Sequence, residues 1–249
     1  MRTGILFPHQ LFEQNPLIEK ADTIYLVEEW LYFKQYNFHQ QKIFFHRASM
    51  KAYQSHLLSL NIKVEYIDAF NPLSDIKKLI PHFKSIGIDS FEYIDTTDQW
   101  LEQRIQKACE QNGVAAHKNH SPLFVLTAEE NARYFSGRKR MFQTDFYKFH
   151  RQQKNILMDA EKNPMGGKWT FDDENRLKYP KGKTPPAVQF STSSLLHEEA
   201  AAYVRQYFPD NYGSINPQFI YPTNFADSKQ WLKTFFSTRF AEFGAYEDA

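Results

Sequence analysis

The sequence contains a single cysteine, Cys109, in 249 residues. One thiol cannot form an intrachain disulfide, and it cannot supply the several thiolates that an iron–sulfur cluster needs. Cys109 lies in a helical pattern between Ala108 and Glu110, which is typical of a structural thiol rather than a nucleophile. We therefore expect no iron–sulfur cluster within this chain.

Long apolar runs and glycine-rich loops are also missing. No apolar run approaches the ~20 residues that cross a bilayer, and the start of the chain is too short for a secretory signal. We expect a cytoplasmic protein without a membrane partner. Neither GxGxxG nor GxxxxGK(S/T) occurs, which argues against an ordinary dinucleotide or triphosphate site. Asp22, His117 and His120 offer no metal geometry, so we assign no metal site. No nucleophile elbow is present, which argues against a hydrolase.

The first half of the chain alternates strand and helix patterns. Short apolar runs rich in β-favouring residues occupy 3–7, 23–27, 62–67, 91–94 and 114–117, and helical patterns occupy 38–60, 72–86 and 98–112. This spacing predicts an α/β fold with a doubly wound, five-stranded parallel sheet in the order 3-2-1-4-5.

After residue 120 the pattern changes to helices and long loops. Thr127 opens a short helix with a capping-box spacing, 141–158 forms a longer helix, and 159–192 is a linker rich in Pro, Gly and Lys. Two further helices are expected near 195–207 and 227–243. We predict three segments: an α/β domain at 1–125, a helical segment with a basic linker at 126–192, and the start of a helical region at 193–249.

In the predicted strand order, the topological switch point falls between the first and fourth strands. This places Pro8, His9 and Gln10 opposite Trp100, with Glu28 and Glu29 close by, in a crevice suited to a planar, hydroxylated heterocycle. Many doubly wound domains leave this crevice empty. For the two glutamates, a solvated strand end is an equally good interpretation.

Several segments together resemble a known family. They are 136–141 (SGRKRM), 145–147 (DFY), 165–176 (MGGKWTFDDENR), 7–11 (FPHQL), 208–213 (FPDNYG) and 243–249 (FGAYEDA). The chain resembles the deoxyribodipyrimidine photolyase-related proteins, a branch of the photolyases and cryptochromes that includes bacterial (6-4) photolyases with an iron–sulfur cluster. The resemblance covers essentially the whole chain.

The resemblance implies that 1–125 is a Rossmann-like antenna domain that holds a pigment, in some members a ribityl-lumazine. The positions that match family motifs are Phe7, Gln10, Glu28, His39 and Lys42. His9 stands where the family usually has an acidic residue, and 30–34 is aromatic where lumazine-binding relatives have small residues. A different pigment, or none, therefore stays open.

The implied parent protein is a light-driven flavoprotein that repairs ultraviolet-damaged DNA or signals from blue light. By resemblance, its FAD and cluster belong to a downstream helical half beyond residue 249, so this chain alone is not expected to catalyse repair. The competing hypothesis is an autonomous Rossmann-like small-molecule-binding or interaction module. A small hydrolase on the same sheet is the least favoured.

Basic residues are concentrated in one part of the chain. The net charge is only +1, yet 137–184 contains twelve Lys or Arg against six Asp or Glu. Given the family, we expect non-specific contacts with the phosphates of DNA, although a solvated helix face is the plainer interpretation of such a charge run. The residues expected to contact DNA are Arg138, Lys139, Arg140, Lys148, Arg151, Lys178, Lys181 and Lys183.

Overall fold

The computed structural model describes residues 2–170, 178–179, 181–184, 186–188, 190, 194–216 and 221–246. The chain forms two compact units. The sheet unit comprises Met1–Leu123 and Val188–Leu232, and the helical unit comprises Phe124–Ala187 and Lys233–Ala249. The segment 193–249, which the sequence sets apart, thus contributes to both units. The predicted three-segment division stays a prediction.

The sheet unit is built on five parallel strands. They are β1 (Thr3–Leu6), β2 (Thr23–Val27), β3 (Lys63–Ile67), β4 (Ser90–Ile94) and β5 (Ala115–Asn119). Their order is β3-β2-β1-β4-β5, with Ile5 of β1 between Tyr25 of β2 and Tyr93 of β4. The α/β fold and the strand order predicted from the sequence are confirmed.

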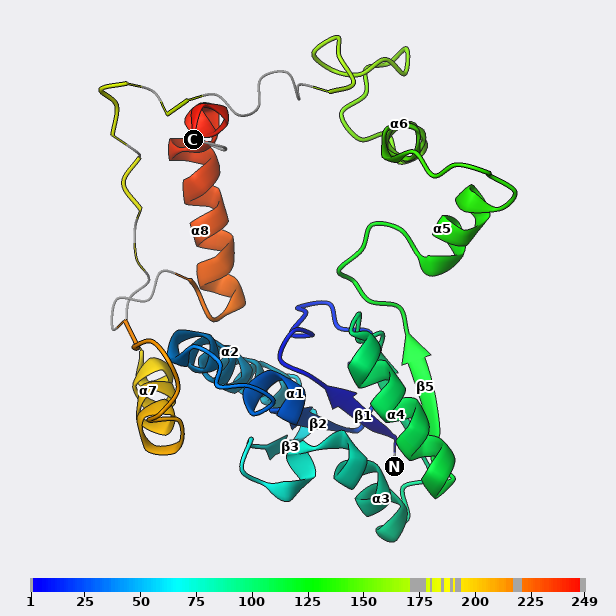
Figure 1. Cartoon of the computed structure of the whole chain (residues 1–249), viewed down its shortest axis with the longest axis vertical. Coiled ribbons are helices and arrows are strands. Elements are labelled where there is room, and N and C mark those ends of the chain that lie inside the picture. The colour runs from blue at the N-terminus through cyan, green and yellow to red at the C-terminus, as the bar shows by residue number, and fades with distance from the viewer. Residues whose placement is uncertain are drawn as a thin grey trace. The chain divides into compact units, whose positions relative to one another are not determined.

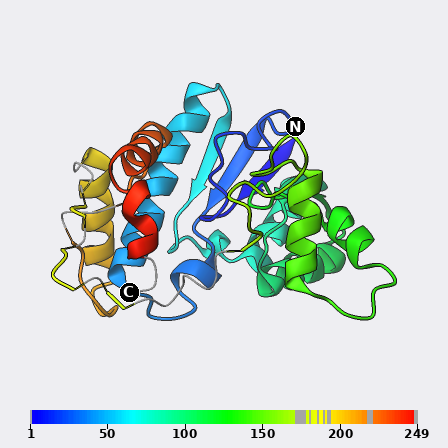
Figure 2. The same cartoon turned by 90° about the horizontal axis from the view of Figure 1, so that it is seen from above.

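Alternate residues of the central strands enter two different cores. Leu6, Ile24 and Leu26 point toward α2 (Gln40–Ser59) and α7 (Leu195–Tyr207). Ile5, Tyr25 and Val27 point toward the opposite face, which α3 (Ile76–Ser85) and α4 (Gln99–Asn112) cover. Figures 1 and 2 show the sheet between these two helix pairs. Both faces of β1 and β2 are buried, which explains their continuous apolar runs.

Local signals in the sequence account for several helix ends. The Asp98 side chain accepts a hydrogen bond from the Leu101 N–H and begins α4, and Gly113, with φ of 63°, ends it. The pattern at 72–86 predicts one helix, but the structure contains a short 3-10 turn, η1 (Pro72–Ser74), before α3. The break falls at Asp75, whose side chain caps α3 through the Lys77 N–H. A one-turn helix, α1 (Trp30–Phe33), was not predicted.

The helical unit contains α5 (Ala128–Phe135), α6 (Gln143–Gln153) and the 3-10 segment η3 (Phe240–Ala245). The predicted capping box is confirmed: the Thr127 side chain accepts from the Glu130 N–H, and the Glu130 side chain accepts from the Thr127 N–H. The Tyr134 ring packs between the two helices, 5.1 Å from the Phe146 ring. Helix α8 (Phe225–Thr238) begins in the sheet unit and ends in the helical unit.

The described part of the chain has neither a membrane-spanning helix nor a metal-binding cluster. None of its helices combines the length and the apolar character needed to cross a membrane. Within the same residues, no three His, Cys, Asp or Glu side chains gather closely enough to hold a metal ion.

Candidate functional site

The chain that leaves β1 is tied directly to the chain that leaves β4. The buried Gln10 side chain donates to the Ile94 carbonyl at 3.1 Å and accepts from the Phe7 N–H at 3.3 Å. His9 Nε2 lies 2.8 Å from the Thr96 carbonyl oxygen. These hydrogen bonds occupy the switch point itself, where the sequence predicts an open crevice, so any ligand site must lie to one side of it.

His9 is left with one unused ring nitrogen. A carbonyl oxygen only accepts, so the hydrogen bond to Thr96 places the proton on Nε2. Burial lowers the pKa of His9, which favours the neutral ring. Its Nδ1 is then a buried acceptor, and it has no partner among the described residues. Buried acceptors are normally paired, so this atom is a ready contact for a ligand or a water.

A cavity of about 660 Å³ opens beside His9 on the α2 face of the sheet. We call it the His9 cleft. Its walls come from the loop after β1, one side of α2 and the start of α8. The lining residues are Pro8, His9, Leu11, Phe12, Glu13, Phe45, Ser49, Ala52, Tyr53, His56, Pro222, Thr223, Asn224, Phe225, Ala226, Ser228 and Lys229.

Aromatic rings dominate this cleft. The Phe225 ring lies 5.0 Å from His56 and 6.0 Å from Tyr53, centroid to centroid. The Tyr53 hydroxyl donates to the Phe12 carbonyl at 2.9 Å, which joins α2 to the loop after β1. The volume and the mixture of rings with a few polar atoms suit a small planar molecule. Phe45, Tyr53 and Phe225 were missed by sequence reasoning because they come from α2 and from a segment about 170 residues further along the chain.

Glu28 is buried and fully occupied by protein groups. One carboxylate oxygen accepts from Arg47 at 2.9 Å and from the Tyr66 hydroxyl at 2.5 Å. The other accepts from the Tyr203 hydroxyl at 2.9 Å and from the Ala69 N–H at 2.8 Å. Four donors satisfy a carboxylate, so this geometry gives Glu28 an internal structural role.

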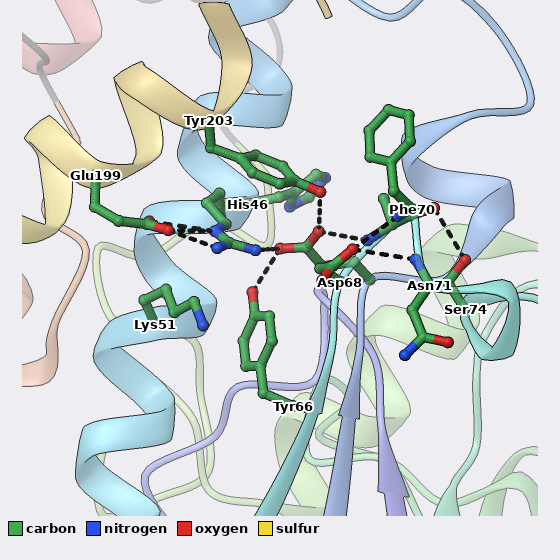
Figure 3. A network of polar contacts seen from close by, with 12 residues as sticks. His46, Lys51, Tyr66, Asp68, Phe70, Asn71, Ser74, Glu199 and Tyr203 are labelled. Carbon is green, nitrogen blue, oxygen red and sulfur yellow. Dashed lines mark hydrogen bonds and ion pairs between the residues drawn. The ribbon is translucent and has the colours of Figure 1, made fainter. Parts of the chain in front are cut away.

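The same network attaches α7 to the rest of the sheet unit. Arg47 also donates to Glu199 of α7 at 2.5 Å, and its guanidinium lies 4.0 Å from the centre of the Tyr203 ring. Figure 3 shows Glu199 and Tyr203 reaching from α7 toward the end of the sheet, with Tyr66 approaching from β3. The partners of Glu28 are as far as 175 residues away in sequence, so no local pattern signals them.

Glu29 is equally buried but less well paired. One carboxylate oxygen accepts from the Ile76 N–H at 3.0 Å, at the start of α3. The other has no hydrogen-bond partner among the described residues, and it lies 3.7 Å from an Arg104 nitrogen. Arg104 makes a closer ion pair with Asp75, at 2.6 Å. Burial raises the pKa of Glu29 to about 8, while the charge of Arg104 opposes this effect.

His39 and Lys42 lie away from the residues that line the His9 cleft. The His39 ring caps α2 by accepting from the Gln41 N–H, and it packs edge-on against Tyr212. A Cβ at Gly213, where φ is 84°, would collide with that ring. The Lys42 ammonium lies 3.5 Å from the centre of the Phe38 ring. His39 therefore helps to dock the segment after α7 onto the start of α2. Their predicted contact with a pigment stays a prediction.

Trp100 also lies outside the cleft, although the sequence predicts it at the same site as His9. The residue is 56% exposed, and it lines a separate cavity on the face that α3 and α4 cover. Phe7 is fully buried in the core on this same face. Of the predicted pigment-binding residues, only Pro8 and His9 line the His9 cleft.

The predicted DNA-contacting residues of the helical unit differ in their exposure and in their contacts with other protein groups. Arg151 is buried and donates to the carbonyls of Ile156, at 2.8 Å, and Leu157, at 2.6 Å, which indicates a structural role. Arg138 donates to the Tyr134 carbonyl at 2.7 Å and lies over the ring of that residue. The Lys148 ammonium lies 5.8 Å from the centre of the Trp169 ring. The exposed residues of this set are Arg138, Lys139, Arg140, Lys178, Lys181 and Lys183.

Comparison with known proteins gives the family. Residues 4–220 match the family model described as deoxyribodipyrimidine photo-lyase-related protein. The chain belongs to this family. It is 25% identical over 238 residues to a (6-4) photolyase from Agrobacterium fabrum, a match that covers 93% of this chain and 46% of that protein. It is 32% identical over 188 residues to an uncharacterized protein of Acanthamoeba polyphaga mimivirus, covering 71% of this chain and 94% of the viral protein.

The chain covers different shares of these two relatives. It spans about half the length of the (6-4) photolyase that it matches, but nearly all of the viral protein. The family match runs from β1 past the end of α7. It therefore includes the loop after β1, α2, and the Glu28 network that joins α2 to α7.

Proposed function

We propose that this photolyase-related chain holds a light-harvesting pigment for a flavoprotein that uses blue or near-ultraviolet light. The flavoprotein would repair ultraviolet-damaged DNA or act in light signalling, and this chain would not be catalytic by itself. The observation that carries the proposal is the His9 cleft: an aromatic cavity of about 660 Å³ beside the switch point of a doubly wound sheet, in a member of this family.

The residues of the cleft fit a pigment of the ribityl-lumazine type. Tyr53 and Phe225 supply apolar ring surface for a flat heterocycle, and Asn224 and Thr223 supply amide and hydroxyl groups near a polyhydroxylated side chain. The unpaired Nδ1 of His9 accepts a hydrogen bond from a ring N–H or a hydroxyl. When bound, such a pigment would absorb near-ultraviolet or blue light and pass the excitation energy to a flavin.

The flavin and the iron–sulfur cluster belong, in this proposal, to polypeptide outside residues 1–249. Cys109 is the only cysteine of the chain, and it is buried. Burial raises the pKa of its thiol to about 11, which disfavours the thiolate that a cluster would require. The residues of this chain therefore do not fit a cluster.

A cleft-filling substitution tests the pigment site. Ser49 lines the cleft from α2, whereas Ser55 lies exposed on the same helix. We expect the purified protein to retain 6,7-dimethyl-8-ribityllumazine, measured by its near-ultraviolet and visible absorption and by the mass of the released pigment. Ser49→Trp should abolish retention because the indole occupies the cleft. Ser55→Trp makes the same change outside the cleft and should leave retention unchanged.

Two results would contradict the proposal. One is a protein that stays colourless and rejects both lumazines and deazaflavins, which would favour an autonomous binding or interaction module. The other is equal retention by the Ser49→Trp and Ser55→Trp variants, which would place the pigment elsewhere. Thermal melting followed by circular dichroism shows whether each variant is folded.

A further inference from the structure

A second cavity, of about 700 Å³, lies in the sheet unit on the face opposite the His9 cleft. We call it the double-tryptophan pocket. Trp30 of α1 forms one wall, and the beginning of α3 contributes Lys77. The remaining wall is a stripe on α4 that includes Trp100, Arg104 and Lys107 at the three- and four-residue spacing of one helix face. No residue lines both this pocket and the His9 cleft.

The two tryptophans make this pocket unusual for a surface depression. Trp100 is 56% exposed, so core packing does not account for its position. Trp30 is partly buried, and the Arg104 guanidinium lies 5.4 Å from the centre of its ring. Indole rings that open onto a cavity offer flat apolar surface on which a heteroaromatic ring stacks.

The charge of the pocket is positive. Its lining includes three basic side chains, and no acidic side chain lines it among the described residues. The charge of Arg104 is offset by Asp75, at 2.6 Å. Lys77 and Lys107 are exposed, and neither forms an ion pair within the described part of the chain. Two lysines that have no ion-pair partner among the described residues therefore line a pocket with two indoles.

One residue that lines the pocket also has a buried donor without a partner among the described residues. Arg104 Nε is shielded from solvent and makes no hydrogen bond to any described residue, although the guanidinium's other end is paired with Asp75. A buried, unpaired N–H normally has a water or a ligand as its partner. This observation is independent of the lysines and the tryptophans, and it falls on a residue that lines the same pocket.

We propose that the double-tryptophan pocket binds a planar heteroaromatic anion of the size of a nucleoside monophosphate. The ring lies against Trp30 or Trp100, and the acidic group lies near Lys77 and Lys107. Ammonium groups bind phosphate as point charges, which suits a chain without a glycine-rich phosphate loop. A site of this kind would be a second ligand site, distinct from the pigment cleft.

Calorimetric titration with AMP tests the proposal, with adenosine and inorganic phosphate as the two partial probes. We expect AMP to bind more tightly than either, because only AMP contacts both the indoles and the lysines. Trp100→Ala should weaken AMP binding by about tenfold, a typical loss for one stacking ring. Because Trp100 is exposed, the variant should remain folded, which thermal melting checks.

Two neighbouring lysines provide a matched pair of variants that tests how much a positive charge contributes to AMP binding. Lys77 lines the pocket, whereas Lys78 is exposed and lies outside its lining. We expect Lys77→Gln to weaken the binding of AMP but not of adenosine, and Lys78→Gln to change neither. The proposed site would be refuted if Lys77→Gln and Lys78→Gln changed the affinity for AMP equally. It would also be refuted if AMP bound no more tightly than phosphate, or if Trp100→Ala left the affinity for AMP unchanged.

The AMP experiment can succeed or fail separately from the test of the pigment site. Ser49→Trp, which fills the His9 cleft, should leave AMP binding unchanged. Trp100→Ala should likewise leave lumazine retention unchanged. If AMP fails to bind while lumazine is retained, the double-tryptophan pocket is refuted and the pigment site stands; the reverse result refutes only the pigment site.

Discussion

Glu28 and Glu29 are neighbours at the end of β2, but they point to opposite faces of the sheet. Glu28 meets Arg47 of α2, and Glu29 meets the beginning of α3 and Arg104 of α4. The alternation of strand residues explains this difference. A solvated strand end, one interpretation of the sequence, does not describe either residue, because both are fully buried. Their surroundings then set their chemistry: Glu28 is saturated with donors, and one oxygen of Glu29 has no hydrogen-bond partner among the described residues.

The buried Glu29 predicts a dependence of stability on pH. Its pKa is about 8 in the folded state, against 4.5 for an ordinary glutamate. Between these values only the folded state binds the proton, so raising the pH from about 4.5 to 8 lowers the free energy of unfolding. The loss should be on the order of a few kcal/mol. Urea unfolding at a series of pH values measures it.

Glu29→Gln is the matched control for this titration. The amide cannot ionise, so the difference in stability between the wild type and this variant should change with pH over the same interval. Other titrating groups affect both proteins equally and cancel in the difference. A difference that is constant from pH 4.5 to 8 would contradict the pKa of about 8.

Among the elements, α7 depends on contacts that are remote in sequence. Its inner face packs on α2 through Ala200, Tyr203 and Val204, all of which belong to the same buried core as α2. Arg47 holds the polar edge of this interface by pairing with both Glu28 and Glu199. An amphipathic pattern predicts the helix itself, but the partner of its apolar side follows only from the tertiary fold.

Removing Arg47 should be costly, because the buried carboxylate of Glu28 would then lose its ion-pair partner and keep only neutral donors. We expect Arg47→Met to lower the free energy of unfolding by about 3–5 kcal/mol, the usual effect of breaking a buried ion pair from one side. The double variant Glu28→Gln/Arg47→Met should recover much of this loss, since no buried charge remains. Denaturant unfolding of the single and double variants checks the prediction, with the exposed neighbour change Glu198→Gln as a control. A double variant no more stable than Arg47→Met would argue against a buried-charge penalty.

At the scale of the whole molecule, charge is divided unevenly along the chain. The net charge is only +1, but residues 137–184 of the helical unit contain an excess of basic side chains. Most of these basic residues are exposed. Among these basic residues, Arg151 and Arg138 already donate hydrogen bonds to backbone carbonyls, Arg138 to that of Tyr134. We propose that the exposed members contact the phosphates of DNA, without reading its sequence.

Charge reversal of two exposed residues tests this surface. We expect Lys139→Glu/Arg140→Glu to weaken binding of the chain to duplex DNA and to reduce the slope of log affinity against log salt by about 2. Lys78→Glu/Lys84→Glu changes the same number of charges on the sheet unit and should have a smaller effect. Fluorescence anisotropy across a range of salt concentrations provides the measurement. An unchanged slope in the first variant would count against phosphate contact.

The sheet order, most helix positions and the family could be predicted from the sequence, because these depend on local periodicity, caps and contiguous motifs. The capping box at Thr127 and the Gly113 helix end are examples. Which residues share a cavity follows only from the folded chain. Trp100 and His9 follow neighbouring strands and were expected together, yet hydrogen bonds from the loop after β1 close the space between them. The cavities consequently open on opposite faces of the sheet, with walls drawn from segments that no local pattern connects.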